Sequence, residues 1–239
     1  SMSPHIYDDN FNFKLENYIV PNEIESLNGH RVAGETVFFF PFNQITKSPE
    51  DAYTEIEDKL DSLFQPILFL TNLQKITWKS NGKEGIYSKR ILKTEQFDNI
   101  RADLTEVESV ENKVIKKELI WLFSTVVSHK QLKSHHRIYV GFFVLDQEEL
   151  ETGYTYEAFC FFPTKEETKL GFVIQAPFLL TDSREGIKAD EQWNVEIMQL
   201  AANLAANSLP ILKTIGERDK TYLLNDSILQ LIPYKESDF

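Results

Sequence analysis

One segment, residues 157–185, restricts what this chain can fold into more than any other. Its aromatic and branched residues predict a strand at Glu157–Phe162 and a second strand at Leu170–Ala176. The charged stretch Pro163–Lys169 between them is typical of a turn. Pro177 follows, and the chain then runs Phe178-Leu179-Leu180-Thr181-Asp182-Ser183-Arg184-Glu185, which predicts a loop that leaves the second strand at a defined point.

Arg184 is the first candidate site residue in this loop. A guanidinium group has a planar fork that matches phosphate oxygens, and it keeps its charge at any physiological pH. Small polar side chains precede it, which favours an anion-binding loop. Alternatively, Arg184 pairs with Asp182 or Glu185 and only stabilises the loop. The residues alone leave both interpretations open.

The rest of the chain predicts a mixture of strands and helices. Ser48 as an N-cap, followed by Pro49 and two acidic residues, predicts a helix that stops at Pro66. Asp190 is expected to cap a long helix with an apolar stripe. A further short helix is expected at Thr221–Leu231. Strands are expected at Phe11–Pro21, Val32–Phe42, Ile67–Leu70, Gln74–Lys79, Ile86–Thr94, Leu119–Ser128 and Arg137–Leu145, the last paired with Tyr156–Phe162.

The sequence also predicts one irregular segment and the residues of the core. The charged segment Glu95–Lys117 is expected to be a loop with a weak strand or helix. The helical stripe is predicted from Trp193, Ile197, Leu200, Leu204 and Leu209. The predicted core comprises Phe39, Leu68, Ile76, Trp121, Val140, Phe142, Phe161, Ile174, Phe178, Trp193, Ile197, Leu200 and Leu204.

Composition narrows the class of protein. With 42% hydrophobic residues and 18 phenylalanines, the chain is globular rather than a disordered tail. Its net charge of −12 argues against a nucleic-acid partner, since such binding depends on clustered Lys and Arg. No apolar run approaches the length of a membrane span. The single cysteine, Cys160, cannot form an internal disulfide, which favours a reducing cytoplasm.

Two tracts resemble one family of ATPases. The first is FxPTKxET…GFVIQAPFLLTDSREGI in the segment above, and the second is Gly34–Phe42, GETVFFFPF. Both are similar to sacsin-like proteins of the GHKL class, the relatives of the ninety-kilodalton heat-shock chaperone. The segment around Leu68–Ile76 resembles the same family as well. The resemblance covers residues 6 to 215 in pattern.

The resemblance implies a fold and a domain order. It implies an α/β (α+β) fold with a mixed sheet, flanking helices and the left-handed βαβ crossover of a GHKL middle or transducer-like domain. Residues 1–47 would be the last strands of a truncated ATP-binding domain, residues 48–218 the middle domain, and residues 219–239 an exit helix. The chain would then be a fragment of a longer protein, in which the ATP-binding domain is the upstream partner.

The resemblance also implies roles for individual residues. Arg184 would sense the γ-phosphate of ATP bound to the preceding domain, with Ser183 in the same loop. Thr36 matches the family's threonine beside the adenine. Lys165 corresponds to a transducer-loop lysine that binds the γ-phosphate, or it belongs to a solvated charge run balanced by Glu166 and Glu167.

Several features of that family are missing from the sequence. The chain has only nine glycines and no G-x-G motif, so no phosphate-cradling loop is encoded. We therefore expect no cofactor and no ATP hydrolysis in this segment alone, with ATP and Mg²⁺ bound only in the parent protein. His129, His135 and His136 lack the spacing of a zinc site and predict a basic surface loop, so no metal is expected.

Two functions of different class remain open. In the first, the segment couples ATP binding and hydrolysis in the upstream domain to conformational change, in a chaperone-like or defence-type role. In the second, it is a non-catalytic scaffold that binds a protein client through an apolar groove and has no nucleotide coupling.

Overall fold

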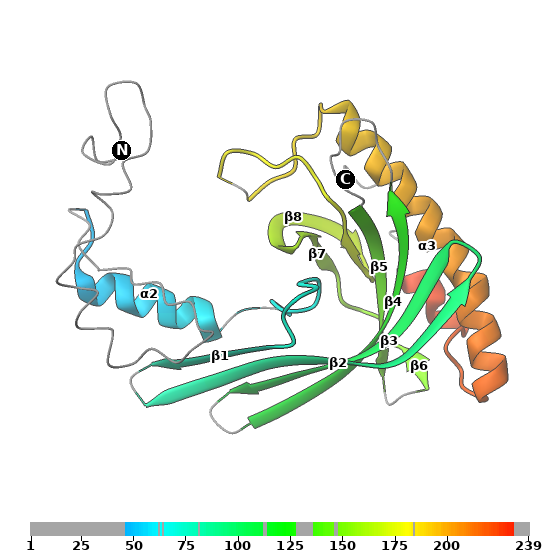
Figure 1. Cartoon of the computed structure of the whole chain (residues 1–239), viewed down its shortest axis with the longest axis horizontal. Helices are drawn as coiled ribbons and strands as arrows, with labels where there is room; N and C mark the ends of the chain where they lie inside the picture. Colours follow the sequence, from blue (N-terminus) through cyan, green and yellow to red (C-terminus); the bar gives the residue numbers. More distant parts are fainter. Residues whose placement is uncertain are drawn as a thin grey trace. The chain divides into compact units, whose positions relative to one another are not determined.

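The computed structural model describes residues 46–231 except Ser62, Phe64, Asn81, residues 112–113, 128–135 and 146–147, and Arg184. In this part the chain has an α+β fold, with a nine-stranded, mostly antiparallel open sheet and two α-helices (Figure 1). The chain divides into two compact units, Ser1–Tyr53 and Thr54–Phe239. The domain boundaries given by the resemblance stay predictions.

Helix α2 spans Pro49–Asp61 and begins as the sequence predicts. The Ser48 hydroxyl accepts a hydrogen bond of 3.0 Å from the backbone N–H of Asp51, which is the expected N-cap bond. Glu50 and Asp51 lie in the first turn, where their charges oppose the helix dipole. The capping residues therefore set the start of this helix.

The first five strands form a continuous antiparallel meander. Each strand pairs with the next one along the chain, and the second and fourth are long enough to extend beyond their predicted limits. The strands are β1 (Lys75–Ser80), β2 (Lys83–Phe97), β3 (Ile100–Glu111), β4 (Val114–Val127) and β5 (His136–Leu145).

The remaining strands complete the sheet in a different order from their order in the chain. The spatial order is β1-β2-β3-β4-β5-β9-β7-β8, with β6 paired to β5. Strand β9 pairs antiparallel with β5 and parallel with β7, so the predicted direct pairing of Arg137–Leu145 with Tyr156–Phe162 is wrong. These strands are β6 (Glu149–Leu150), β7 (Tyr156–Cys160), β8 (Phe162–Leu170) and β9 (Val173–Gln175).

The stretch predicted as a charged turn, Pro163–Lys169, is instead most of strand β8. Its buried positions are threonines rather than apolar residues. The Thr164 hydroxyl donates to the Ala158 carbonyl at 2.8 Å, and the Thr168 hydroxyl donates to the Tyr156 carbonyl at 2.6 Å. Because these bonds satisfy the buried hydroxyls, a strand with charged outward residues is stable here.

Two further secondary-structure predictions are wrong. Glu95–Lys117 contains the end of β2, all of β3 and the start of β4, because long cross-strand pairing outweighs its charged composition. Ile67–Leu70 is not a strand, since Ile67–Phe69 form a buried turn and Leu70 follows it. Its carbonyls bond to a side chain, since Lys89 Nζ donates to the Leu68 oxygen at 3.0 Å and to the Leu70 oxygen at 2.7 Å.

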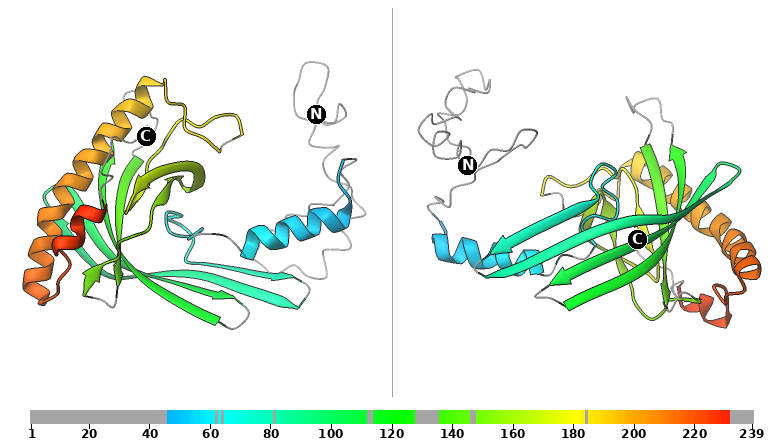
Figure 2. Two further views of the ribbon diagram at one scale, coloured as in Figure 1. Left: turned by 180° about the vertical axis from the view of Figure 1, so that it is seen from behind. Right: turned by 60° about the horizontal axis from the view of Figure 1, so that its bottom comes forward.

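Helix α3, Gln192–Asp219, covers one face of the sheet, which we call the helix face (Figure 2). Its N-cap is Glu191 with no side-chain bond, so the predicted cap at Asp190 is wrong. The 3₁₀ helix η3, Asp226–Leu231, packs against the same cluster and ends where Leu231 accepts a backbone bond from Gly171. The buried residues of the helix face include Trp121, Phe123, Val140, Phe142, Ile174, Phe178, Ile197, Ala201, Leu204 and Leu212.

Most of the predicted core residues that the structure describes are buried, with two clear exceptions. Leu200 is 41% exposed because the buried stripe of α3 runs through Ile197, Ala201 and Leu204 instead. Phe161 is 44% exposed because it lies at the turn between β7 and β8, with a positive φ of 67°. Phe39 lies outside the described residues.

The opposite face of the sheet, which we call the cavity face, has a smaller apolar cluster. The buried turn Ile67–Phe69 packs on it, and the Phe69 ring makes an edge contact with the Phe159 ring. Other members of this cluster are Trp78, Tyr87, Val107, Ile120, Leu122, Phe143 and Val173.

Candidate functional site

The loop that follows β9 is closed at its base by backbone hydrogen bonds. Leu180 and Ile187 form an isolated antiparallel bridge. Inside it, the Thr181 N–H donates to the Gly186 carbonyl at 2.9 Å, and outside it the Lys188 N–H donates to the Leu179 carbonyl at 3.0 Å. The segment Leu180–Ile187 is therefore a short hairpin-like loop, which we call the hairpin loop.

Asn194, in the first turn of α3, ties the base of this loop to the helix. Its side-chain oxygen accepts from the Leu179 N–H at 2.8 Å. Its amide nitrogen donates to the carbonyls of Leu179 and Lys188 at 2.9 and 2.8 Å. Asn194 is 2% exposed, and Phe178 beside it is buried as predicted. The loop base and the start of α3 thus form one bonded unit.

Lys165, a predicted phosphate ligand on β8, lies beside the hairpin loop. Its ammonium group is 2.7 Å from a carboxylate oxygen of Glu185, and its backbone N–H donates to the Glu185 carbonyl at 2.7 Å. Glu166, the next residue, accepts a weaker bond of 3.4 Å from the Ile187 N–H. The loop is therefore bonded to β8 as well as to α3.

Ser183 lies at the exposed tip of the same loop. Its hydroxyl is 3.1 Å from the Thr181 hydroxyl, which also accepts a bond from the Gly186 N–H. Of the four predicted site residues, Ser183 thus lies in the hairpin loop, and Lys165 contacts the loop from β8. The other two, Arg184 and Thr36, lie outside the described residues, and their roles stay predictions.

A polar cavity that the sequence did not predict lies on the cavity face of the sheet. It has a volume of about 300 Å³. Strands β2 to β5 contribute its floor, and the segment around the buried turn forms a further wall. It is lined by Leu68, Phe69, Thr71, Gln74, Lys89, Ile91, Arg101, Asp103, Thr105, Leu122, Ser124, Arg137 and Tyr139.

The carboxylate of Asp103, which lines this polar cavity, accepts hydrogen bonds from two neighbouring side chains. Asp103 is 7% exposed, and Arg101 Nε donates to its two oxygens at 3.0 and 2.8 Å. The Thr94 hydroxyl donates to the same carboxylate at 2.5 Å. Because Arg101 uses Nε for this contact, the pair of Nη groups at the end of the guanidinium can serve a ligand.

Other donors approach the polar cavity from neighbouring strands. Arg137 Nη1 donates to the Ser124 hydroxyl at 3.2 Å. Burial raises the pKa of Tyr139, so its phenol stays protonated at neutral pH and can donate a hydrogen bond. Burial lowers the pKa of Lys89 to about 8, which still leaves most of this side chain charged at neutral pH.

Thr105 is the one described lining residue of this cavity with a fully buried and unpaired polar atom. The residue is 1% exposed, and its hydroxyl has no hydrogen-bond partner. Buried hydroxyls are normally bonded, and each exception indicates a missing partner or a functional role.

The local sequence gave no indication of the polar cavity, because its residues come together only through the register of four strands.

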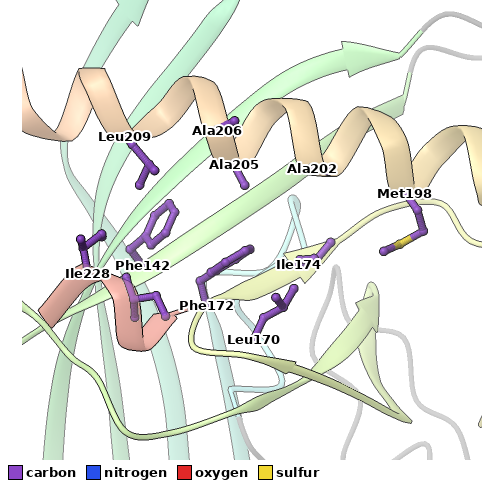
Figure 3. Close-up of a pocket in the computed structure, with 11 residues that line it drawn as sticks. Phe142, Leu170, Phe172, Ile174, Met198, Ala202, Ala205, Ala206, Leu209 and Ile228 are labelled. Carbon is purple, nitrogen blue, oxygen red and sulfur yellow. The ribbon is translucent and has the colours of Figure 1, made fainter. Parts of the chain in front are cut away.

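A second cavity lies on the helix face, between α3, the end of the sheet and η3 (Figure 3). Its volume is about 340 Å³. Alanines of α3 form one wall, and the rings of Phe142 and Phe172 form another (Figure 3). Apart from backbone atoms, the lining is apolar, and it includes Leu170, Ile174, Met198, Ala202, Ala205, Ala206, Leu209, Ile228 and Leu231.

The chain has no match among known proteins. No protein-family model, curated protein or solved structure matches this chain. In the part of the chain that the structure describes, no helix has the length and apolar character of a membrane span. The same residues contain no group of three or more His, Cys, Asp and Glu side chains that could hold a metal ion.

Proposed function

We propose that this chain is the coupling module of a sacsin-like GHKL ATPase, and that the hairpin loop responds to ATP bound on an upstream domain. The proposal rests on the resemblance of residues 159–187 and 34–42 to that family. The observation that supports it best is the double attachment of the loop. Asn194 ties its base to α3 and Lys165 ties it to β8, so a force on the exposed tip acts on both the helix and the sheet.

The chemistry of the tip fits this role. Thr181 and Ser183 offer hydroxyl groups, and Arg184 lies in the chain between Ser183 and Glu185. A guanidinium supplied by a neighbouring domain is a common stabiliser of phosphoryl transfer. Loop ordering around a γ-phosphate is also a common way of coupling nucleotide state to shape. Catalysis would thus be assisted by this module and carried out on the upstream domain.

The proposal also includes the ligands, the crossover and the partner domain that the resemblance implies. The parent protein would bind ATP and Mg²⁺ in the cytoplasm, and the fold would contain a left-handed βαβ crossover. A strand after α3 would be needed to complete such a crossover, and no strand follows α3 among the described residues. The partner in the same polypeptide would be the ATP-binding domain.

The experiment is ATP turnover by a longer polypeptide that contains the upstream ATP-binding domain. Arg184→Ala should lower turnover by at least about tenfold, equivalent to roughly 1.4 kcal/mol of transition-state stabilisation. Thermal stability should stay the same, because we expect Arg184 to be solvated, and a solvated loop charge contributes little to folding.

Arg90→Ala provides the matched control for this experiment. Arg90 is an exposed arginine on β2 that pairs with Glu106, and its loss should leave turnover unchanged. Equal turnover in wild type and Arg184→Ala, in an active enzyme, would contradict the coupling role.

A second candidate function, binding of a protein client, is favoured by the apolar cavity of Figure 3. We propose a basic, amphipathic client peptide as its occupant. The cavity would take one or two apolar side chains, and the chain's net charge of −12 would attract the basic ones. In this case the segment would act as a scaffold without nucleotide coupling.

Filling the apolar cavity tests this second function. Ala205→Phe should abolish binding of a fluorescent Leu/Lys amphipathic peptide, as measured by anisotropy. Asn207→Phe is the control, because Asn207 is exposed on the same helix and does not line the cavity. Equal peptide binding by wild type and Ala205→Phe would rule out this cavity as the client site.

A further inference from the structure

We propose that the polar cavity on the cavity face binds the phosphate group of a small phosphate monoester. This site is separate from the hairpin loop, since the two share no residue. The inference therefore goes beyond the proposed coupling function, and it can be tested on this chain alone.

Charge is the first reason for this assignment. Lys89, Arg101 and Arg137 line the polar cavity with three positive charges, and Asp103 is the only carboxylate among the described residues that line it. Three positive charges and one negative charge leave a net charge of two positive. A phosphate monoester near neutral pH carries close to two negative charges. The balance is notable in a chain whose total charge is −12.

The arrangement of donors is the second reason. Asp103 fixes Arg101 through Nε and leaves its Nη groups, which form the fork that binds phosphate oxygens. Arg137 is held by the Ser124 hydroxyl through one Nη atom. The two guanidinium groups come from β3 and β5, on either side of β4, so they can approach one anion from two sides.

The unpaired hydroxyl of Thr105 is the third and independent reason. Thr105 Oγ1 is buried and has no partner, although leaving a buried hydroxyl without a hydrogen bond is costly. A phosphate oxygen would accept its hydrogen bond. The neutral phenol of Tyr139 can donate in the same way. A ligand would therefore satisfy the Thr105 hydroxyl, which the described part of the protein leaves without a partner.

The size and walls of the polar cavity indicate an ester rather than free phosphate. A volume of about 300 Å³ equals that of roughly ten water molecules. This volume exceeds what a single phosphate group needs, and it lies at the lower end of ligand pockets. Leu68, Phe69 and Leu122 supply apolar wall surface next to the cations. That surface suits the organic part of the ligand.

Calorimetric titration of the 239-residue chain tests the proposal with two probes, phenyl phosphate and inorganic phosphate. Phenyl phosphate should bind at least about tenfold more tightly than inorganic phosphate. Arg137→Gln should weaken the binding of phenyl phosphate by at least about tenfold, because it removes a charged donor. Arg137→Lys should recover part of the loss, since it restores the charge without the fork.

Arg90→Gln is the matched control, because Arg90 lies on β2 but does not line the polar cavity. It should change the dissociation constant by less than about twofold. Circular dichroism should confirm that each variant is folded. Where Arg137→Gln does not fold, the paired change Arg101→Gln with Asp103→Asn provides the second test, since it removes the cation and its buried partner together.

Three results would overturn the proposal. One is the absence of binding by either probe at millimolar concentration in the wild-type chain. A second is equal affinity for phenyl phosphate in wild type and in the folded cavity variants. A third, inorganic phosphate binding as tightly as phenyl phosphate, would overturn the assignment of an ester and identify a site for free phosphate.

Discussion

The helix face of the sheet packs a large apolar cluster beneath α3, whereas the cavity face combines an apolar cluster with a polar cavity. On the helix face, Phe123 and Phe142 are packed ring against ring. On the cavity face, the same strands place Leu122 in an apolar cluster and Ser124 in a polar cavity only two residues later. Both faces therefore have a cavity, and the two cavities differ in chemistry, since the one beneath α3 is apolar and the one on the cavity face is polar.

The largest expected effect comes from the helix face. Phe123→Ala should lower the free energy of unfolding by about 3–5 kcal/mol, because Phe123 is fully buried between Trp121 and Phe142. Val126→Ala on the same strand should change it by no more than about 0.5 kcal/mol, since Val126 is 47% exposed. Urea unfolding measures both values. A loss under about 1 kcal/mol for Phe123→Ala would contradict the structural role of this face.

A smaller effect should appear on the cavity face as a dependence on pH. Burial lowers the pKa of Lys89 from 10.5 to about 8 in the folded state. Between pH 8 and pH 10 the unfolded chain therefore holds a proton that the folded chain lacks, and stability rises with pH. Relative to Lys89→Met, the wild type should gain about 1 kcal/mol over this range, after allowance for partial exposure of the group.

Urea unfolding of both proteins at pH 7, 8, 9 and 10 checks this prediction for Lys89. Subtracting the variant removes the titration of the other groups. Below about pH 7 the difference between the two proteins should be constant, since Lys89 is then charged in both states. A difference that stays constant up to pH 10 would show that the Lys89 side chain is hydrated and not buried.

A further prediction compares two buried threonines, and its smallest effect is expected at Thr105. Thr105→Val should leave the free energy of unfolding unchanged or raise it by up to about 1 kcal/mol, because the hydroxyl that it removes has no partner. Thr168→Val should lower it by about 1–2 kcal/mol, since that hydroxyl donates to the Tyr156 carbonyl and accepts from the Leu170 N–H. A destabilising Thr105→Val would mean that its hydroxyl is bonded within the folded chain.

The helix face was largely predictable from the sequence, because its burial follows simple patterns. Strand β5 was predicted at Arg137–Leu145 and begins one residue earlier. One error falls where the buried residues are polar. Strand β8 was interpreted as a turn since its inward residues, Thr164 and Thr168, are not apolar.

The two candidate sites differ in the same way. Residues of the hairpin loop are close in the sequence, so the sequence could suggest this loop as one site, and the roles of Lys165 and Ser183 in it stay predictions. The polar cavity could not be predicted, because Lys89, Arg101 and Arg137 come from three different strands. Alternating charged residues in a strand normally face solvent, and only the register of the sheet brings these together.

The attachment of the hairpin loop determines where this chain can accept extra residues. Asn194 bonds to Leu179 and to Lys188, so any insertion between the loop base and α3 would separate the amide from its partners. Asp182, Ser183 and Glu185 are exposed, and they lie beyond the bridge that closes the loop. A short epitope inserted at this tip would extend outward from a base that keeps its shape, which makes the tip a natural attachment point for a reporter group.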